Sequence, residues 1–117
     1  MSNSTDLRDI QKAVWRTAEE HGWHGENDSI PVKLVMIHSE VSEALEEYRN
    51  TSPESEVSDL YYNGFSDKPE GFGVELADIV IRVLDLAEML GMDLTDLILT
   101  KMKYNESRPY RHGGKRV

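Results

Sequence analysis

The chain contains no cysteine, so disulfide bonds, thiolate catalysis and cysteine-ligated zinc are all excluded. With four prolines and eight glycines in 117 residues, it is neither a fibrous nor a low-complexity chain. It also lacks a long apolar run, because charged residues interrupt the most apolar tract, residues 74–90. The first residues show no basic segment followed by an apolar one, so we expect no signal peptide. These absences predict a single soluble domain, residues 1–117, in the cytoplasm.

Positive charge is also scarce, because 13 lysines and arginines stand against 22 aspartates and glutamates, for a formal net charge of -9. This balance argues against a protein that coats nucleic acid polymers. The few basic residues are concentrated at the end of the chain, where residues 101–117 hold six of them and a single acidic residue. The distribution fits either a solvated surface with a basic tail (residues 109–117), or an acidic metal-binding region combined with a basic phosphate-binding one.

Apolar residues recur at spacings of three and four in four segments, which predicts an all-α chain of four main helices. The first helix begins at a cap among residues 4–6 and ends near Glu20, and the second begins at a cap among residues 27–29 and ends at Arg49. The third covers residues 74–90, and the fourth follows a cap at Asp93 and ends near Arg108. Residues 51–70 predict a long loop, with one short helical turn near residues 57–61.

The third predicted helix is apolar over more than half of its circumference, so we expect it to be buried on several sides. A chain of this size has too few other residues to cover so much apolar surface alone. We therefore expect a helical bundle that is completed by homo-oligomerisation, as a dimer or a tetramer. The second predicted helix carries an apolar stripe of its own, at Leu34, Ile37, Val41, Leu45 and Tyr48.

Two pairs of carboxylates stand out, Glu40 with Glu43 in the second predicted helix and Glu75 with Asp78 in the third. The members of each pair are three residues apart and share one helix face, so all four can converge if the helices lie side by side and antiparallel. Oxygen donors alone suit a hard cation, Mg²⁺ or Mn²⁺, whose charge would relieve their mutual repulsion. On the second helix, the same residues also fit an ordinary charged surface.

The third predicted helix favours the metal-site interpretation of the carboxylates over an ordinary charged surface. It carries a narrow charged strip on an otherwise apolar surface, and buried charges require partners or a metal. The strip consists of Glu75, Asp78, Arg82 and Asp85.

Three strings that follow one another in the chain carry a family resemblance: SEVSEALEE (39–47), VELADIVIRVLDLAEMLGMDL (74–94) and KMKYNESRPYRHGGK (101–115). Together they resemble the MazG-type members of the all-α nucleoside triphosphate pyrophosphohydrolase superfamily. The resemblance implies a helical fold assembled as a dimer or tetramer. It also implies Mg²⁺-dependent cleavage between the α and β phosphates of a nucleotide, which releases a monophosphate and pyrophosphate and clears unwanted nucleotides.

The resemblance also assigns roles to residues of this chain. The metal-binding and catalytic carboxylates of the family motif fall on Glu40, Glu43, Glu75 and Asp78. The motif of the fourth helix falls on four residues that would bind the substrate, Lys101, Tyr104, Asn105 and Arg108. The insertion between the two carboxylate motifs, residues 44–74, is longer than in compact members of the family.

Aromatic and glycine residues outside these motifs suggest further contacts with a nucleotide. Trp23 lies in a segment rich in His and Gly and can stack on a base, whereas Trp15 fits the core side of the first helix. His112, followed by two glycines, can close over phosphates as a flexible flap.

Two other functions are alternatives to the hydrolase. A ferritin-like di-metal bundle places a Glu-x-x-His pair on each of two helices, and this sequence has no such pair. The second alternative is a non-catalytic acidic helical module that binds or regulates a partner protein through the third helix. The sequence does not name the nucleotide.

Overall fold

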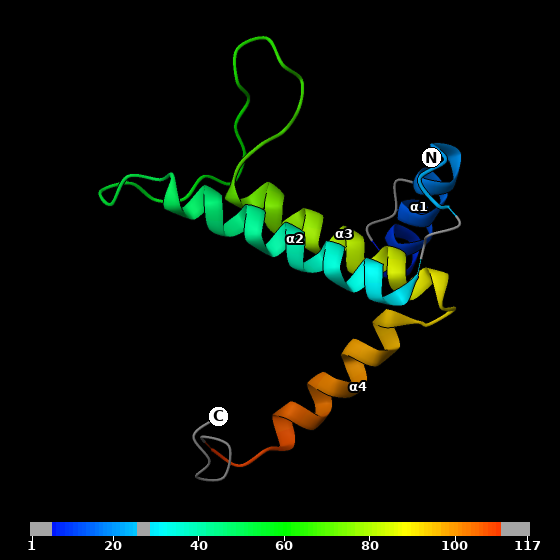
Figure 1. Cartoon of the computed structure of the whole chain (residues 1–117). Helices are drawn as coiled ribbons and strands as arrows, with labels where there is room; N and C mark the ends of the chain where they lie inside the picture. Colours follow the sequence, from blue (N-terminus) through cyan, green and yellow to red (C-terminus); the bar gives the residue numbers. More distant parts are fainter. Residues whose placement is uncertain (1–5, 26–28, 111–117) are drawn as a thin grey trace.

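The computed structural model describes residues 6–25 and 29–110, and within them the chain is all-α. Its four helices are α1 (Leu7–Glu20), α2 (Ile30–Arg49), α3 (Phe72–Met89) and α4 (Leu94–Ser107) (Figure 1). The four expected helices are therefore confirmed, with small shifts at their ends. Along the described residues, no helix combines the length and the apolar character that a membrane span needs.

Three of the helices begin where the sequence predicts a side-chain cap. Each cap accepts a hydrogen bond from a backbone N–H of the first turn, at donor–acceptor distances of 2.8, 3.3 and 3.2 Å. The caps are Asp6 in α1, Ser29 in α2 and Asp93 in α4. Gly22 and Gly91 follow α1 and α3 with φ of 67°, a conformation that favours glycine and ends a helix.

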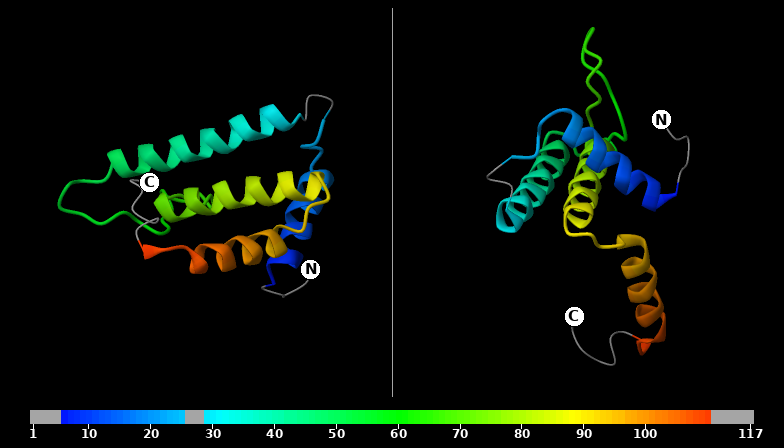
Figure 2. Two further views of the ribbon diagram at one scale, coloured as in Figure 1. Left: turned by 90° about the horizontal axis from the view of Figure 1, so that it is seen from below. Right: turned by 90° about the vertical axis from the view of Figure 1, so that its right-hand side faces the viewer.

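The helices α2 and α3 lie side by side and antiparallel along most of their length (Figures 1 and 2). The helix α1 crosses this pair at the end where α2 begins and α3 ends, and it packs mainly on α3. The helix α4 diverges from the pair. A four-helix bundle is thus incomplete among the described residues of one chain, and its completion by further copies stays a prediction.

Among the described residues, the beginning of α4 is joined to α1. The Arg8 guanidinium lies 2.9 Å from a carboxylate oxygen of Asp93 and 2.6 Å from one of Asp96. The buried Gln11 amide donates a hydrogen bond of 2.8 Å to the backbone carbonyl of Met92. Beyond this attachment, α4 extends away from the helix pair (Figure 1).

The buried core of the described chain is small. Leu84 of α3 is the large side chain that is fully enclosed, at 1% exposure, and it is joined by buried alanines of α1, α2 and α3. The apolar stripe of α2 is not enclosed, because Leu34, Val41 and Leu45 are about half exposed. On α3, Leu76 and Val80 are also half exposed, so the expected burial on several sides is not reached within the chain.

The long connection between α2 and α3 rises away from the helices as an open loop (Figure 1). The expected helical turn near residues 57–61 is wrong, because this stretch forms no helix and contains a bend at Asp59. Tyr61 forms an antiparallel bridge with Glu70 through two backbone hydrogen bonds of 2.8 and 3.0 Å. The Tyr61 hydroxyl also donates to the carboxylate of Glu47 at 3.1 Å, which ties the loop to α2.

The same loop caps the N-terminus of α3, which has no side-chain cap. The backbone N–H groups of Gly73 and Val74 donate to the carbonyls of Ser58 and Asp59, both at 3.1 Å. The contact is tight, because a Cβ at position 73 would lie 2.6 Å from the Asp59 carbonyl oxygen. Glycine at this position therefore lets the loop satisfy the first turn of α3.

A Gly73→Ala variant is expected to lose about 1–3 kcal/mol of unfolding free energy, the usual cost of forcing an atom into a packed contact. The added methyl group has to push away backbone rather than a flexible side chain. Chemical denaturation monitored by circular dichroism measures the effect. Gly25→Ala is the matched control, because its Cβ would meet nothing within 4 Å. Equal stability of the two variants would contradict the capping contact.

Candidate metal centre and adjoining cavity

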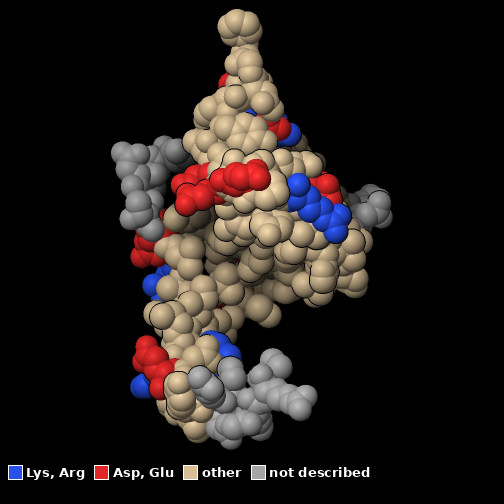
Figure 3. Space-filling model, turned by 90° about the vertical axis from the view of Figure 1, so that its left-hand side faces the viewer, with Lys and Arg blue, Asp and Glu red and all other residues tan. Residues whose placement is uncertain are grey.

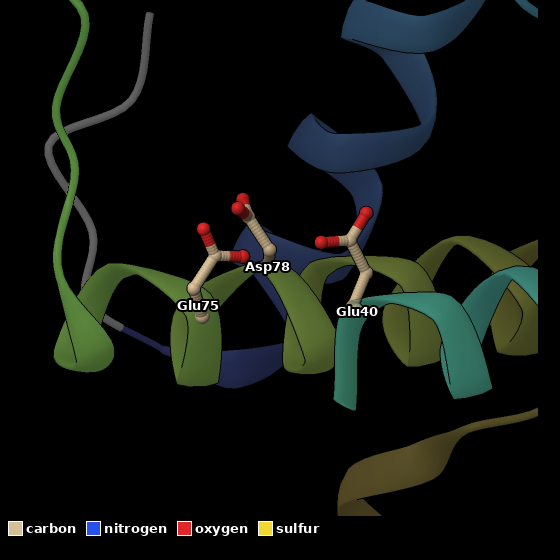
Figure 4. Close-up of side chains that lie close together, drawn as sticks. All are labelled: Glu40, Glu75 and Asp78. Carbon is tan, nitrogen blue, oxygen red and sulfur yellow. The ribbon is translucent and has the colours of Figure 1, made fainter. Parts of the chain in front are cut away.

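Three carboxylates converge above the α2–α3 pair. Glu40 comes from α2, and Glu75 and Asp78 come from successive turns of α3 (Figure 4). Each offers one oxygen, and these three oxygens lie within 4.8 Å of one another. All three residues are half-buried, so their charges are held close together where water screens them incompletely.

The sequence pattern explains this convergence. A spacing of three residues puts Glu75 and Asp78 on one face of α3, and the antiparallel packing brings Glu40 of α2 beside them. Glu43, the fourth predicted ligand, is exposed and lies outside the group of three. It is near enough for its negative charge to raise the pKa of Glu75.

Burial and mutual repulsion disfavour the ionised forms of Glu75 and Asp78. Burial, followed by the charges of Asp78 and Glu40, raises the pKa of Glu75 to about 6. The pKa of Asp78 is also raised, by burial and by Glu40, although the nearby Arg82 opposes the shift. Carboxylates packed in this way release repulsion when a cation binds them.

The donor set fits a small divalent cation. All the donors are carboxylate oxygens, the ligands that Mg²⁺ prefers. Opposite ligands of Mg²⁺ are about 4.2 Å apart, since each lies 2.0–2.1 Å from the ion. The three oxygens lie within 4.8 Å of one another, which is close to that span.

A cavity of about 950 Å³ adjoins the cluster between α1, α2 and α3, and this volume suits a small-molecule ligand. Glu40 and Asp78 form part of its wall, so the candidate metal site opens directly into it. Apolar side chains line other parts of the wall: Ile10, Val14, Val32, Met36 and Ile81. Trp23 also contributes, and it is 68% exposed. The predicted stacking residue is therefore placed where it can meet a ligand.

A second charged group, formed by His24, Lys33 and Asp85, lines the same cavity. Asp85 of α3 accepts a hydrogen bond of 2.5 Å from the Lys33 ammonium and contacts His24 Nε2 at 2.9 Å. His24 Nδ1 contacts Glu19, and the ring stacks on Trp15 with centroids 3.9 Å apart. Because a carboxylate lies at each ring nitrogen, both nitrogens must carry a proton to satisfy both contacts, which requires the charged imidazolium.

The protonation of His24 predicts a pH dependence of stability. Burial lowers the His24 pKa, but hydrogen bonds to Asp85 and Glu19 outweigh it, so the folded-state pKa is raised. The stabilisation is complete below the unfolded pKa of about 6.5 and is lost as pH rises through the raised folded value. The melting-temperature difference between wild type and His24→Gln should therefore shrink from pH 6 to pH 9. His21→Gln, at an exposed neighbouring histidine, is the control. A difference that does not change with pH would contradict the charged state.

The predicted substrate-binding residues of α4 are placed differently. They do not line the cavity within the described chain, because α4 extends away from it. Lys101 Nζ lies 4.7 Å from the ring centroid of Tyr104, so two of the residues share one face of the helix. Asn105 is exposed and Arg108 is half-buried at the helix end. His112 and the rest of the predicted flap lie outside the described residues.

Three charged or titratable residues of the cavity lining, His24, Lys33 and Arg82, had no role assigned from the sequence. Arg82 contacts Glu40 with 2.7 Å between Nε and Oε1, and the charged group around Asp85 joins α2 and α3 to the segment after α1. The signal was present in part, because Asp78, Arg82 and Asp85 recur at helical spacing on the charged strip of α3. Their partners lie far away in the sequence, so pairing could not be inferred.

The chain has no significant match among known protein families, curated proteins or solved structures. Geometry and chemistry therefore carry the functional argument, together with the motif resemblance.

Proposed function

We propose that this protein is a Mg²⁺-dependent nucleoside triphosphate pyrophosphohydrolase that cleaves (d)NTPs into a monophosphate and pyrophosphate. The observation that carries the proposal is the convergence of Glu40, Glu75 and Asp78, two of which, Glu40 and Asp78, line a cavity large enough for a nucleotide. The resemblance of the sequence motifs to MazG-type enzymes supports the same reaction. The cellular role of the protein would be to remove unwanted nucleotides from the cytoplasmic pool.

The chain's own residues would divide the work as follows. Glu40, Glu75 and Asp78 hold the ion, with Glu43 completing the site from the next turn of α2. A divalent ion held there supplies positive charge that offsets the phosphates and activates water for attack. Mn²⁺ has the same ligand preference and should substitute. One of these carboxylates would accept the proton from the attacking water.

The bond changes balance without a further reactant. The water oxygen forms a bond to the α phosphorus, and the bond between that phosphorus and the oxygen bridging to the β phosphate breaks. The water proton passes to the carboxylate, and the bridging oxygen leaves with pyrophosphate. The apolar wall and Trp23 provide surfaces against which a base can pack.

The proposal includes a homo-oligomer. The chain exposes 9417 Å², whereas a compact monomer of 13.4 kDa exposes about 6500 Å². The excess is about 2900 Å² per chain, part of which belongs to the protruding loop, and obligate interfaces bury about 1000–2500 Å² on each partner. The surface is also hollowed between the helix pair and α4 (Figure 3), where a second copy can pack. In such an assembly, α4 would bring Lys101 and Arg108 to the phosphates in a neighbouring copy's cavity.

We expect size-exclusion chromatography with light scattering to give a dimer or tetramer at micromolar concentration. Val80→Glu places a charge on the half-exposed apolar surface of α3 and should shift the protein to monomer. Leu60→Glu is the control, because Leu60 is equally exposed but lies on the loop. A clean wild-type monomer would overturn the assembly.

The reaction is tested by measuring pyrophosphate and monophosphate release from a panel of canonical and modified (d)NTPs with millimolar Mg²⁺. Hydrolysis of a subset is expected and would name the substrate class. Release of inorganic phosphate alone would place the cleavage at another bond. If no nucleotide of the panel is hydrolysed with either Mg²⁺ or Mn²⁺, the proposal is overturned.

The exposed apolar residues of α2, α3 and α4 favour one alternative, a non-catalytic module that binds a partner protein. That function needs neither a cation nor a cavity beside the carboxylates. A melting temperature that does not respond to millimolar Mg²⁺, together with a monomeric state, would favour the module.

A further inference from the structure

Arg82 occupies a position that connects the candidate metal centre with the cavity. It lies one helical turn after Asp78 on α3, and its Nε is 2.7 Å from Oε1 of Glu40 on α2. The Glu40 side chain is 15% exposed and that of Arg82 is 39% exposed. Both residues line the cavity wall together with Asp78.

The guanidinium and a divalent ion would compete for the same carboxylate. Glu40 belongs to the group of three converging acids, and in this structure its charge is balanced by Arg82. The influence of Arg82 extends to Asp78, whose raised pKa it partly lowers. Once an ion neutralises Glu40 and Asp78, the guanidinium loses its electrostatic reason to remain on Glu40.

The cavity offers Arg82 a new partner when a nucleotide is bound. A triphosphate whose oxygens reach Glu40 and Asp78 through the ion comes within reach of the next turn of α3, about 6 Å along the helix. A guanidinium pairs with phosphate oxygens in a bidentate manner. The basic residues of α4, by contrast, do not line this chain's cavity.

We propose that Arg82 is a nucleotide-binding residue that neutralises Glu40 in the ion-free protein and moves to the substrate phosphates when a divalent ion takes its place. This assignment rests on the proposed function. It makes ion and nucleotide binding cooperative, because the ion frees the side chain that the nucleotide uses.

The test compares the full-length wild type with Arg82→Gln in two measurements. Isothermal titration with Mg²⁺ alone should show a severalfold tighter Kd in the variant, because the competing cation is gone. Nucleotide hydrolysis at saturating Mg²⁺ should show a KM raised by about tenfold or more, the loss of one charged hydrogen-bonding partner. A purely structural ion pair would lower thermal stability without moving these two values in opposite directions.

Two further variants sharpen the comparison. Arg82→Lys keeps the charge but not the planar fork, so Mg²⁺ affinity should stay near wild type while KM rises in part. Arg49→Gln removes an arginine that pairs with Glu46 on α2 outside the cavity, and it should change neither value. Unchanged Kd and KM in Arg82→Gln would overturn the assignment while leaving wild-type hydrolysis, and thus the proposed function, intact. Absence of hydrolysis by the wild type would overturn both.

Discussion

Asp78→Asn should lower pyrophosphate release by more than about a hundredfold, because changes even to the partners of metal ligands commonly cost 10–100-fold. The substitution keeps the shape of the side chain and removes one of the three converging charges. It also removes repulsion that raises the pKa of Glu75, so the metal-free fold should be at least as stable as wild type. Loss of activity with preserved helix content would therefore report on the site and not on folding.

The matched control is Asp67→Asn, at an exposed loop position away from the cavity lining. Hydrolysis of the best nucleotide of the panel and the melting temperature with and without Mg²⁺ would be measured for both variants. The wild type and the control should melt higher with Mg²⁺, and Asp78→Asn should not. Full activity in Asp78→Asn would remove this cluster from the mechanism.

The effect of Mg²⁺ on the melting temperature should also depend on pH. Because the Glu75 pKa is about 6, its proton competes with the ion below that pH. Without metal, the ionised form is disfavoured in the fold, so this group makes the protein less stable as pH rises through 6. The Mg²⁺-induced increase in melting temperature should therefore be larger at pH 7 than at pH 5.

Leu84→Ala is expected to destabilise the fold by about 2–5 kcal/mol, the usual cost of removing a buried leucine. Leu84 is 1% exposed and lies where α3 packs against its neighbours. Few other large side chains are enclosed in the described chain, so the loss is a large part of a typical total of about 5–15 kcal/mol.

Chemical denaturation at fixed protein concentration measures this loss, since oligomerisation would add concentration dependence. Leu60→Ala removes the same atoms from a half-exposed loop position and should cost much less. Similar losses for both variants would mean that the core is not centred on Leu84.

The helices and the shared face of Glu75 and Asp78 could be predicted from the sequence because both depend on local spacing. Caps at Asp6, Ser29 and Asp93 mark the helix starts, and a three-residue spacing fixes which carboxylates of α3 share a face. The helical spacing of apolar residues also predicts which helix faces are buried. It does not show whether the same chain or another copy buries them. The exposed stripe of α2 is the clearest example.

Contacts between distant parts of the sequence escaped prediction. His24, in the segment after α1, contacts Asp85 of α3, and Ser58 and Asp59 cap α3 with backbone carbonyls that carry no side-chain signal. Ion pairs between Arg8 and the start of α4 join that helix to α1, and helical periodicity does not encode them.

The loop that caps α3 links a protruding surface to the carboxylates. The hydrogen bonds from Gly73 and Val74 to the loop hold the turn that carries Glu75, so the loop cannot lift off without loosening this ligand. Linkage is reciprocal, so an ion on Glu75 should in turn slow hydrogen exchange at those two amides. A molecule that binds the loop tip would then change the affinity for the ion without entering the cavity.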